Sequence, residues 1–194
     1  MHYWGQEDTS VHFCEKKYDQ VWWAAELFNT ISSAFYIIVG GCFLGSHLDR
    51  LGKAVIGVGI GSWILHMTLR YYGQWIDEIA MLLLCFLCAK KVKKTLSNYL
   101  LIPIIYLYTL LHQYFVYFFG IFTLAQFYLI YYSLKHIRET KRICIFGYIL
   151  FFIIGGSCWM VDQIFCEVVQ PYQLHAWWHF FTAFGTMFGL LAIY

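Results

Sequence analysis

Seven apolar segments, separated by short polar connections, constrain this chain more than any other feature. Such segments are typical of membrane-spanning helices, which need about 20 mostly apolar residues each unless neighbouring helices shield them. The candidate spans are residues 24–46, 54–71, 74–89, 99–111, 115–134, 143–165 and 172–193. Because 61% of the 194 residues are hydrophobic and only 12% are charged, the sequence predicts an all-α membrane protein built as a seven-helix bundle.

Basic residues follow alternate spans and predict the orientation of this bundle. They are Arg50, Lys53, Lys90, Lys91, Lys93, Lys94, Lys135, Arg138, Lys141 and Arg142, out of 13 Lys and Arg residues. Since short basic connections face the cytosol, we expect a lumenal or external N-terminal segment over residues 1–23 and a cytosolic C-terminus. Residues 1–194 show no linker or repeat and are interpreted as one domain, and the net charge of +2 argues against a nucleic-acid partner.

Two histidines four residues apart begin the last predicted span. In the segment LHAWWH, His175 and His179 face the same way on a helix, and two neutral imidazoles on one face make half of a zinc site. The segment GSWILHMTLRYYGQWIDE offers His66 as a third ligand, with Ser62 one turn earlier and Asp77 just after a short break. Polar side chains inside a bilayer usually mark a function.

The expected orientation puts these polar residues at one depth. His66 is near the end of an outward-running span, Asp77 is near the start of the next inward-running span, and His175 and His179 begin the last one. At 1.5 Å per residue, all of them fall within one or two turns of the outer interface. Three separate pieces of chain therefore contribute potential ligands at the same level, which favours a common site.

Other interpretations of these polar residues remain open at this point. Histidines near span ends more often form interhelical hydrogen bonds than bind metal, and we interpret three of them in this way. These are His47, His112 and His136. A haem is a further alternative, because His66 and one histidine of the later pair could bind iron from opposite sides. Ser62 could also be a helix-packing serine.

Five stretches of the sequence resemble the alkaline ceramidases. They read YWGQEDTSVHFCEKKY, AAELFNTISS, GSWILHMTLRYYGQWIDE, DQIFCE and LHAWWHFFTAFG, and they cover almost the whole chain in the family's order. This family lies within the CREST superfamily of seven-helix membrane hydrolases, which also includes the adiponectin and progestin receptors. The resemblance implies an intramembrane zinc amidase of the endoplasmic reticulum or Golgi that hydrolyses ceramide, or a related lipid amide, to sphingosine and a fatty acid.

The resemblance also implies roles for the polar residues. His66, His175 and His179 match the family's zinc ligands, and Ser62 and Asp77 match its two other catalytic positions. Three protein ligands leave a zinc position for water, whose pKa falls to about 7. We expect Asp77 to act as the base while this water attacks the amide carbonyl, and Ser62 to reach the oxyanion. The alternatives are a heptahelical receptor of the same superfamily with little or no catalysis and, from another class, a haem protein.

The N-terminal segment departs from the family's pattern. The family carries a calcium site there, built from a motif like Asp-Trp-Cys-Glu-x-Asn-Tyr and a later glutamate. Here Glu15 and Glu26 match, but His12 replaces a carboxylate and Lys17 replaces an amide. Imidazole is a poor calcium ligand and an ammonium repels the ion. We therefore expect that calcium binding is lost and that Lys17 bridges the two glutamates; the alternative is that Lys17 points into solvent.

Two cysteines match a pair that forms a disulfide in the family. Cys14 and Cys166 both fall on the expected outer side, where an oxidising lumen permits the bond. The remaining cysteines lie in or beside spans and are expected to be free: Cys42, Cys85, Cys88, Cys144 and Cys158. The bond would tie the N-terminal segment over the helix ends that carry the ligands.

Overall fold

The computed structural model describes residues 3–133 and 139–194, and this part of the chain is all-α. Its α-helices are α1 (Leu27–Ser32), α2 (Ala34–Gly41), α3 (Asp49–Thr68), α4 (Tyr71–Val92), α5 (Leu101–Leu111), α6 (Phe115–Ser133), α7 (Glu139–Ile164), α8 (Cys166–Val169) and α9 (Leu174–Ile193). The predicted connection that contains Lys135, His136 and Arg138 lies outside the described residues, as does the last residue of the predicted span 115–134.

The helices follow the predicted apolar segments. α1 and α2 together occupy the first predicted span, and α3, α4, α5, α6, α7 and α9 occupy the others. In the described residues, four stretches are long and apolar enough to cross a membrane: Asp49–Thr68, Asn98–Tyr128, Lys141–Ile164 and Leu174–Ile193. The all-α prediction is therefore confirmed, whereas seven membrane crossings and their orientation stay predictions.

The first span is shorter and less regular than the predicted segment 24–46. α1 ends at Ser32, and α2 ends at Gly41 before a series of turns. The hydroxyl groups of Ser32 and Ser33 both donate to the carbonyl oxygen of Asn29, at 3.1 and 2.9 Å. Such bonds from serine to a preceding carbonyl compete with the helical ladder and bend helices, so polar residues divide this span.

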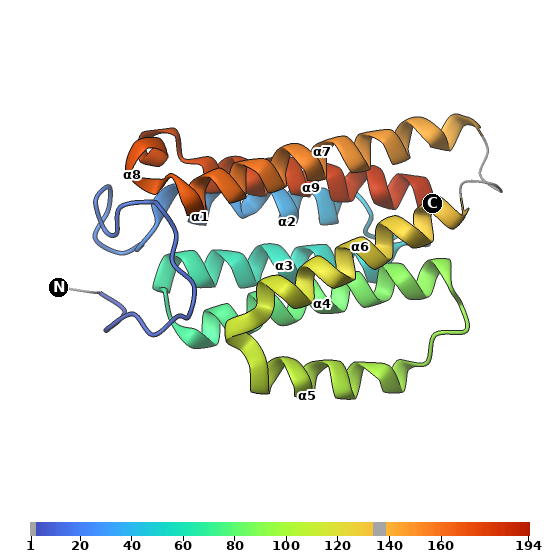
Figure 1. Cartoon of the computed structure of the whole chain (residues 1–194), viewed down its shortest axis with the longest axis horizontal. Coiled ribbons are helices and arrows are strands. Elements are labelled where there is room, and N and C mark those ends of the chain that lie inside the picture. Colours follow the sequence, from blue (N-terminus) through green and yellow to red (C-terminus); the bar gives the residue numbers. More distant parts are fainter. Residues whose placement is uncertain (1–2, 134–138) are drawn as a thin grey trace.

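Successive long helices run in opposite directions and form a two-layered bundle (Figure 1). α1, α2, α7 and α9 lie on one side and α3, α4 and α5 on the other, with α6 crossing between them. The N-terminal segment, the turn from α3 to α4 and α8 are gathered at one end of the bundle. The C-terminus and the connection from α4 to α5 lie at the opposite end.

Two glycines bring α3 and α4 into close contact at the end near α8. A Cβ atom at Gly61 would lie 2.6 Å from the Cα atom of Asp77, and one at Gly73 would lie 2.9 Å from the Cα atom of Leu65. Only residues without a side chain let two helix backbones approach this closely. The contact places the first turns of α4 directly against the last turns of α3.

The N-terminal segment is fastened over this end of the bundle. A disulfide joins Cys14 to Cys166, at the start of α8. The backbone N–H of Ser10 donates to Oε1 of Gln74 at 2.8 Å, and Nε2 of Gln74 donates to the Ser10 hydroxyl at 2.6 Å. Asp8 forms an ion pair of 3.0 Å with Arg70. The segment therefore contacts both layers of the bundle.

Candidate metal centre

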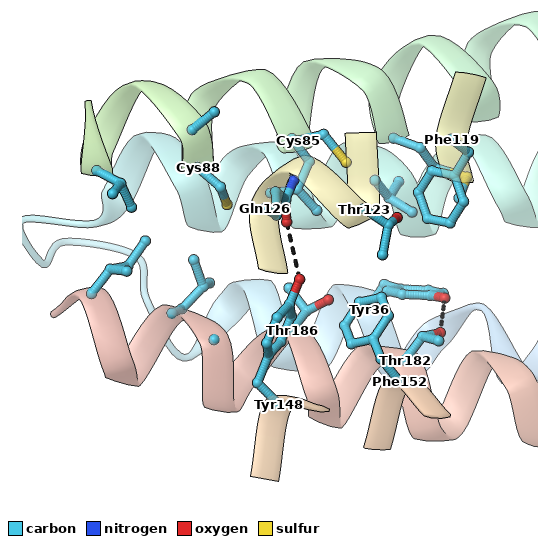
Figure 2. Close-up of a pocket in the computed structure, with 18 of the residues that line it drawn as sticks. Tyr36, Cys85, Cys88, Phe119, Thr123, Gln126, Tyr148, Phe152, Thr182 and Thr186 are labelled. Atoms are coloured by element: carbon cyan, nitrogen blue, oxygen red, sulfur yellow. Dashed lines mark hydrogen bonds between the residues drawn. The ribbon is translucent and has the colours of Figure 1, made fainter. Parts of the chain in front are cut away.

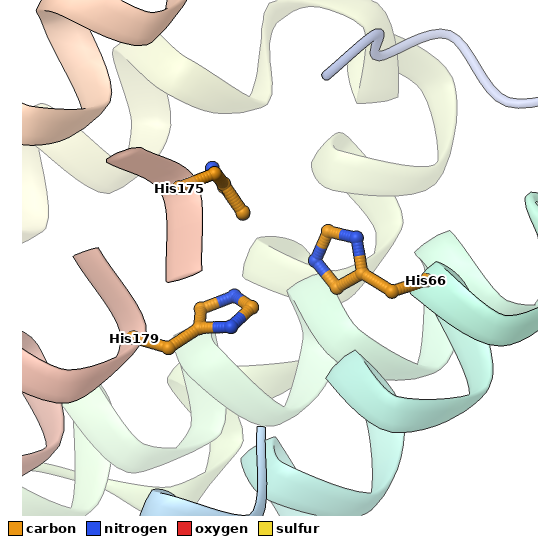
Figure 3. A group of neighbouring side chains, drawn as sticks. All are labelled: His66, His175 and His179. Carbon is orange, nitrogen blue, oxygen red and sulfur yellow. The ribbon is translucent and has the colours of Figure 1, made fainter. Parts of the chain in front are cut away.

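Three histidine side chains converge near this end of the bundle (Figure 3). His66 comes from the last turn of α3, and His175 and His179 come from the first two turns of α9. One ligand atom from each lies within 4.8 Å of the others, and all three side chains are buried. Among the described residues, no other group of three or more His, Cys, Asp or Glu side chains has this geometry.

Hydrogen bonds orient the imidazole rings from outside the group. Nδ1 of His66 lies 2.6 Å from a carboxylate oxygen of Glu26, and Nδ1 of His179 lies 2.7 Å from the hydroxyl of Ser32. Metal-binding histidines commonly use their second nitrogen in this way. Nδ1 of His175 is buried without a hydrogen-bond partner, which is costly unless a ligand satisfies it. The arrangement thus fits a metal ion held by three neutral imidazoles.

The other two residues predicted for the site lie beside the histidines. The hydroxyl of Ser62 is 2.9 Å from the Ser33 hydroxyl and 3.4 Å from Nε2 of His179. Asp77 is buried, and its Oδ1 has no hydrogen-bond partner. Ser62, Asp77 and the three histidines line one cavity. The structure therefore brings all five residues to the same space and leaves a carboxylate oxygen free to act there.

This cavity has a volume of about 790 Å³ and extends from the polar residues between apolar side chains. The apolar wall includes Phe119 and Phe127 of α6 and Phe152 of α7. A smaller cavity of about 70 Å³ shares Phe119 and Phe152 with it (Figure 2). There the hydroxyl of Tyr148 donates to Gln126 at 3.1 Å. A ligand with one polar part and a long apolar part matches this division.

Lys17 lies against the centre and does not point into solvent. Its ammonium forms an ion pair with Glu26 and donates to the backbone oxygen of Phe13 at 3.0 Å. The side chain of His12, by contrast, is exposed. The alternative interpretation of Lys17 as a solvent-facing residue is wrong, and one half of the predicted bridge is present.

The predicted contact of Lys17 with Glu15 is replaced in the structure by hydrogen bonds from the backbone to Glu15. The two carboxylate oxygens of Glu15 accept the backbone N–H groups of Phe28 and Asn29 at 2.8 and 2.9 Å. These N–H groups belong to the first turn of α1, where helical donors have no partner within the helix. Glu15 therefore caps α1, and within the described residues the ion pair of Lys17 is with Glu26.

Sequence reasoning did not identify Phe13 and Ser32 around the histidines, and it assigned Glu26 to the altered calcium site without expecting its contact with His66. The ring of Phe13 packs on His66 and His175, with centroid distances of 4.6 and 4.3 Å. Ser32 and Glu26 orient the imidazoles through the bonds described above. A sequence signal for the first span existed, because its polar residues recur at helical spacing (Glu26, Asn29, Ser32 and Ser33) and so share one face.

Comparison with known proteins gives a consistent result. A family model described as Ceramidase matches residues 5–194. Alkaline ceramidase 3 of Mus musculus is 31% identical in an alignment that covers 97% of this chain and 84% of the mouse protein. Alkaline ceramidase of Arabidopsis thaliana is 25% identical, with 95% and 82% covered. Alkaline ceramidase 1 of Mus musculus is 22% identical, with 96% and 80% covered.

Proposed function

The chain belongs to the alkaline ceramidase family, and from this premise we propose that it hydrolyses the amide bond of ceramide to give sphingosine and a free fatty acid. The observation that supports this most is the buried group of His66, His175 and His179 at one end of a cavity large enough for a lipid. The proposed location is the membrane of the endoplasmic reticulum or Golgi, with ceramide and membrane lipids as partners.

We propose zinc as the resident metal. Three imidazoles are a common catalytic zinc ligand set and leave a coordination position open. The buried, unpartnered nitrogen of His175 and the oriented rings of His66 and His179 support this choice. A zinc ion held there would supply Lewis-acid chemistry, polarising a carbonyl and lowering the pKa of water to about 7.

The protein's own groups supply the proton transfers and the oxyanion contact. Asp77 has a buried oxygen without a partner in the same cavity, so it can take a proton from the attacking water and return it to the leaving amine. The Ser62 hydroxyl faces His179 and can donate to the oxygen that becomes negative as the amide carbon becomes tetrahedral. The apolar walls between α6 and α7 hold the acyl chain and exclude water.

Turnover of a fluorescent ceramide by the purified protein, with and without a zinc chelator, tests this function. His175→Ala and His179→Ala should abolish hydrolysis and lower zinc content together, because three ligands are the minimum of such a site. Asp77→Asn should keep zinc while hydrolysis falls by about 100-fold or more. His47→Ala is the control, since His47 packs on Tyr194 at the C-terminus, and it should retain activity.

Three outcomes would contradict the proposal. Near-full activity or zinc loss in Asp77→Asn would refute the role of that residue. A protein that holds zinc without chelator-sensitive turnover would support the receptor alternative. Iron with a Soret band in place of zinc would support the haem alternative.

A further inference from the structure

An ammonium group lies among oxygen atoms beside the metal centre. The side chain of Lys17 is only 25% exposed and is held by Glu26 and by the backbone oxygen of Phe13. Glu26 is fully buried, and its second oxygen lies 2.6 Å from Nδ1 of His66. A single carboxylate thus bridges a lysine of the N-terminal segment and an imidazole of the histidine group.

We propose that Lys17 is a positioning residue whose ammonium takes the place of a calcium ion at this end of the bundle, as the cation that pairs with the Glu26 carboxylate. It holds the Glu26 carboxylate in place, and Glu26 in turn holds the ring of His66. This inference rests on the proposed metal centre and is independent of which lipid the protein hydrolyses.

The charge balance around Glu26 supports this role. A fully buried carboxylate is costly unless a cation or several hydrogen-bond donors compensate it. Glu26 accepts hydrogen bonds from Asn29, at 3.1 Å, and from His66, but the histidine is neutral when it binds a metal. Among the described residues, Lys17 therefore supplies the full positive charge that is paired with this carboxylate.

Calcium does not fit the same oxygens. The ion needs about six to eight oxygen ligands, but the oxygens of Glu26 already contact Lys17 and His66. Both oxygens of Glu15 accept backbone N–H groups. The exposed His12 side chain offers nitrogen instead of oxygen. An added dication would also be repelled by the ammonium, so the structure disagrees with the family's calcium site.

The link to His66 gives Lys17 a measurable effect on metal binding. A carboxylate that accepts the Nδ1–H of an imidazole fixes the tautomer that presents Nε2 to a metal, and loss of such a partner typically weakens metal affinity by about 10- to 100-fold. Without Lys17, the buried Glu26 carboxylate has no charge partner. It should then hold the Nδ1–H of His66 less firmly.

The first test compares Lys17→Met with Lys16→Met in the full-length protein. Both variants lose one positive charge, but Lys16 is exposed and serves as the matched control. Zinc affinity, measured by competition with a chromophoric chelator, should fall by about tenfold in Lys17→Met and stay at the wild-type level in Lys16→Met. The absorption spectrum of the cobalt-substituted protein should change only in Lys17→Met. Equal affinities and spectra in the two variants would refute the proposal.

The second test restores a calcium site. Lys17→Asn combined with His12→Asp replaces the ammonium and the imidazole by oxygen ligands, so millimolar calcium should raise the melting temperature and zinc affinity of this double variant. The melting temperature of the wild-type protein should not respond to calcium, and this result can be obtained even if Lys17→Met does not fold. Stabilisation of the wild-type protein by calcium would overturn the inference. None of these measurements uses ceramide, so they remain decisive if the proposed reaction proves wrong.

Discussion

At the residue scale, the first span orients two of the three histidines. Asn29 accepts the hydroxyl of Ser32 and donates to Glu26. Ser32 then contacts His179, and Glu26 contacts His66. One polar face of a short helix therefore reaches both layers of the bundle through hydrogen bonds, although Oδ1 of Asn29 is buried without a hydrogen-bond partner.

Glu15 should make the stability of the protein depend on pH. Burial raises the pKa of its carboxyl from 4.5 to about 7, against the opposing effect of the backbone N–H groups of Phe28 and Asn29. Between these two values the folded protein binds a proton that the unfolded chain releases, so stability decreases as pH rises from 4.5 to about 7. In Glu15→Gln, the melting temperature should fall less over this range than in the wild-type protein. Equal slopes from thermal scans of the two proteins would contradict this assignment.

The sequence predicted the members of the histidine group but not their hydrogen-bond partners. His175 and His179 share a face through helical spacing alone, and the depth of His66 follows from the order of the spans. The contacts of Ser32 and Glu26 depend on how α1 is rotated against α3 and α9. Such a rotation is set by packing among several helices, which no local pattern in the chain specifies.

At the element scale, the position of Asp77 depends on the contact between α3 and α4. Spacing within one helix could predict that Ser62 and His66 are neighbours, but it could not predict how closely the next helix approaches. The structure shows that Gly61 makes this approach possible. The prediction of one continuous span over 24–46 also missed the division into α1 and α2. Hydropathy does not indicate that serine hydroxyls will bond to a preceding backbone carbonyl.

Gly61→Ala should therefore displace Asp77. The new Cβ would lie 2.6 Å from the Cα atom of Asp77, and relieving such a contact with backbone typically costs about 1–3 kcal/mol. We expect a lower melting temperature and a loss of ceramide hydrolysis. Gly57→Ala is the matched control one turn away in α3, because its Cβ would have its nearest neighbour at 4.0 Å, the Cβ of Ala80. Similar thermal stability of both variants would show that α4 does not depend on this contact.

At the scale of the whole molecule, the two ends of the bundle differ in chemistry. The end with the histidines carries the disulfide between Cys14 and Cys166, and Arg70 at this end forms an ion pair with Asp8. The opposite end carries basic side chains in the first turns of α3 and in the last turn of α4 and the connection after it: Arg50, Lys53, Lys90, Lys91, Lys93 and Lys94. Disulfides persist in oxidising compartments, and short basic connections remain in the cytosol.

The disulfide and the basic connections both predict that the histidine group faces the lumen or the outside, although each depends on a different physical cause. An N-glycosylation acceptor added before Met1 should therefore be glycosylated in cells, and one inserted at 93–97, between α4 and α5, should not. A shift in electrophoretic mobility that glycosidase reverses would report the modification, and each tagged protein should retain ceramide hydrolysis to show that it is folded. The reverse pattern would place the histidines at the cytosolic side, and it would mean that neither the basic residues nor the disulfide determines how this bundle is inserted.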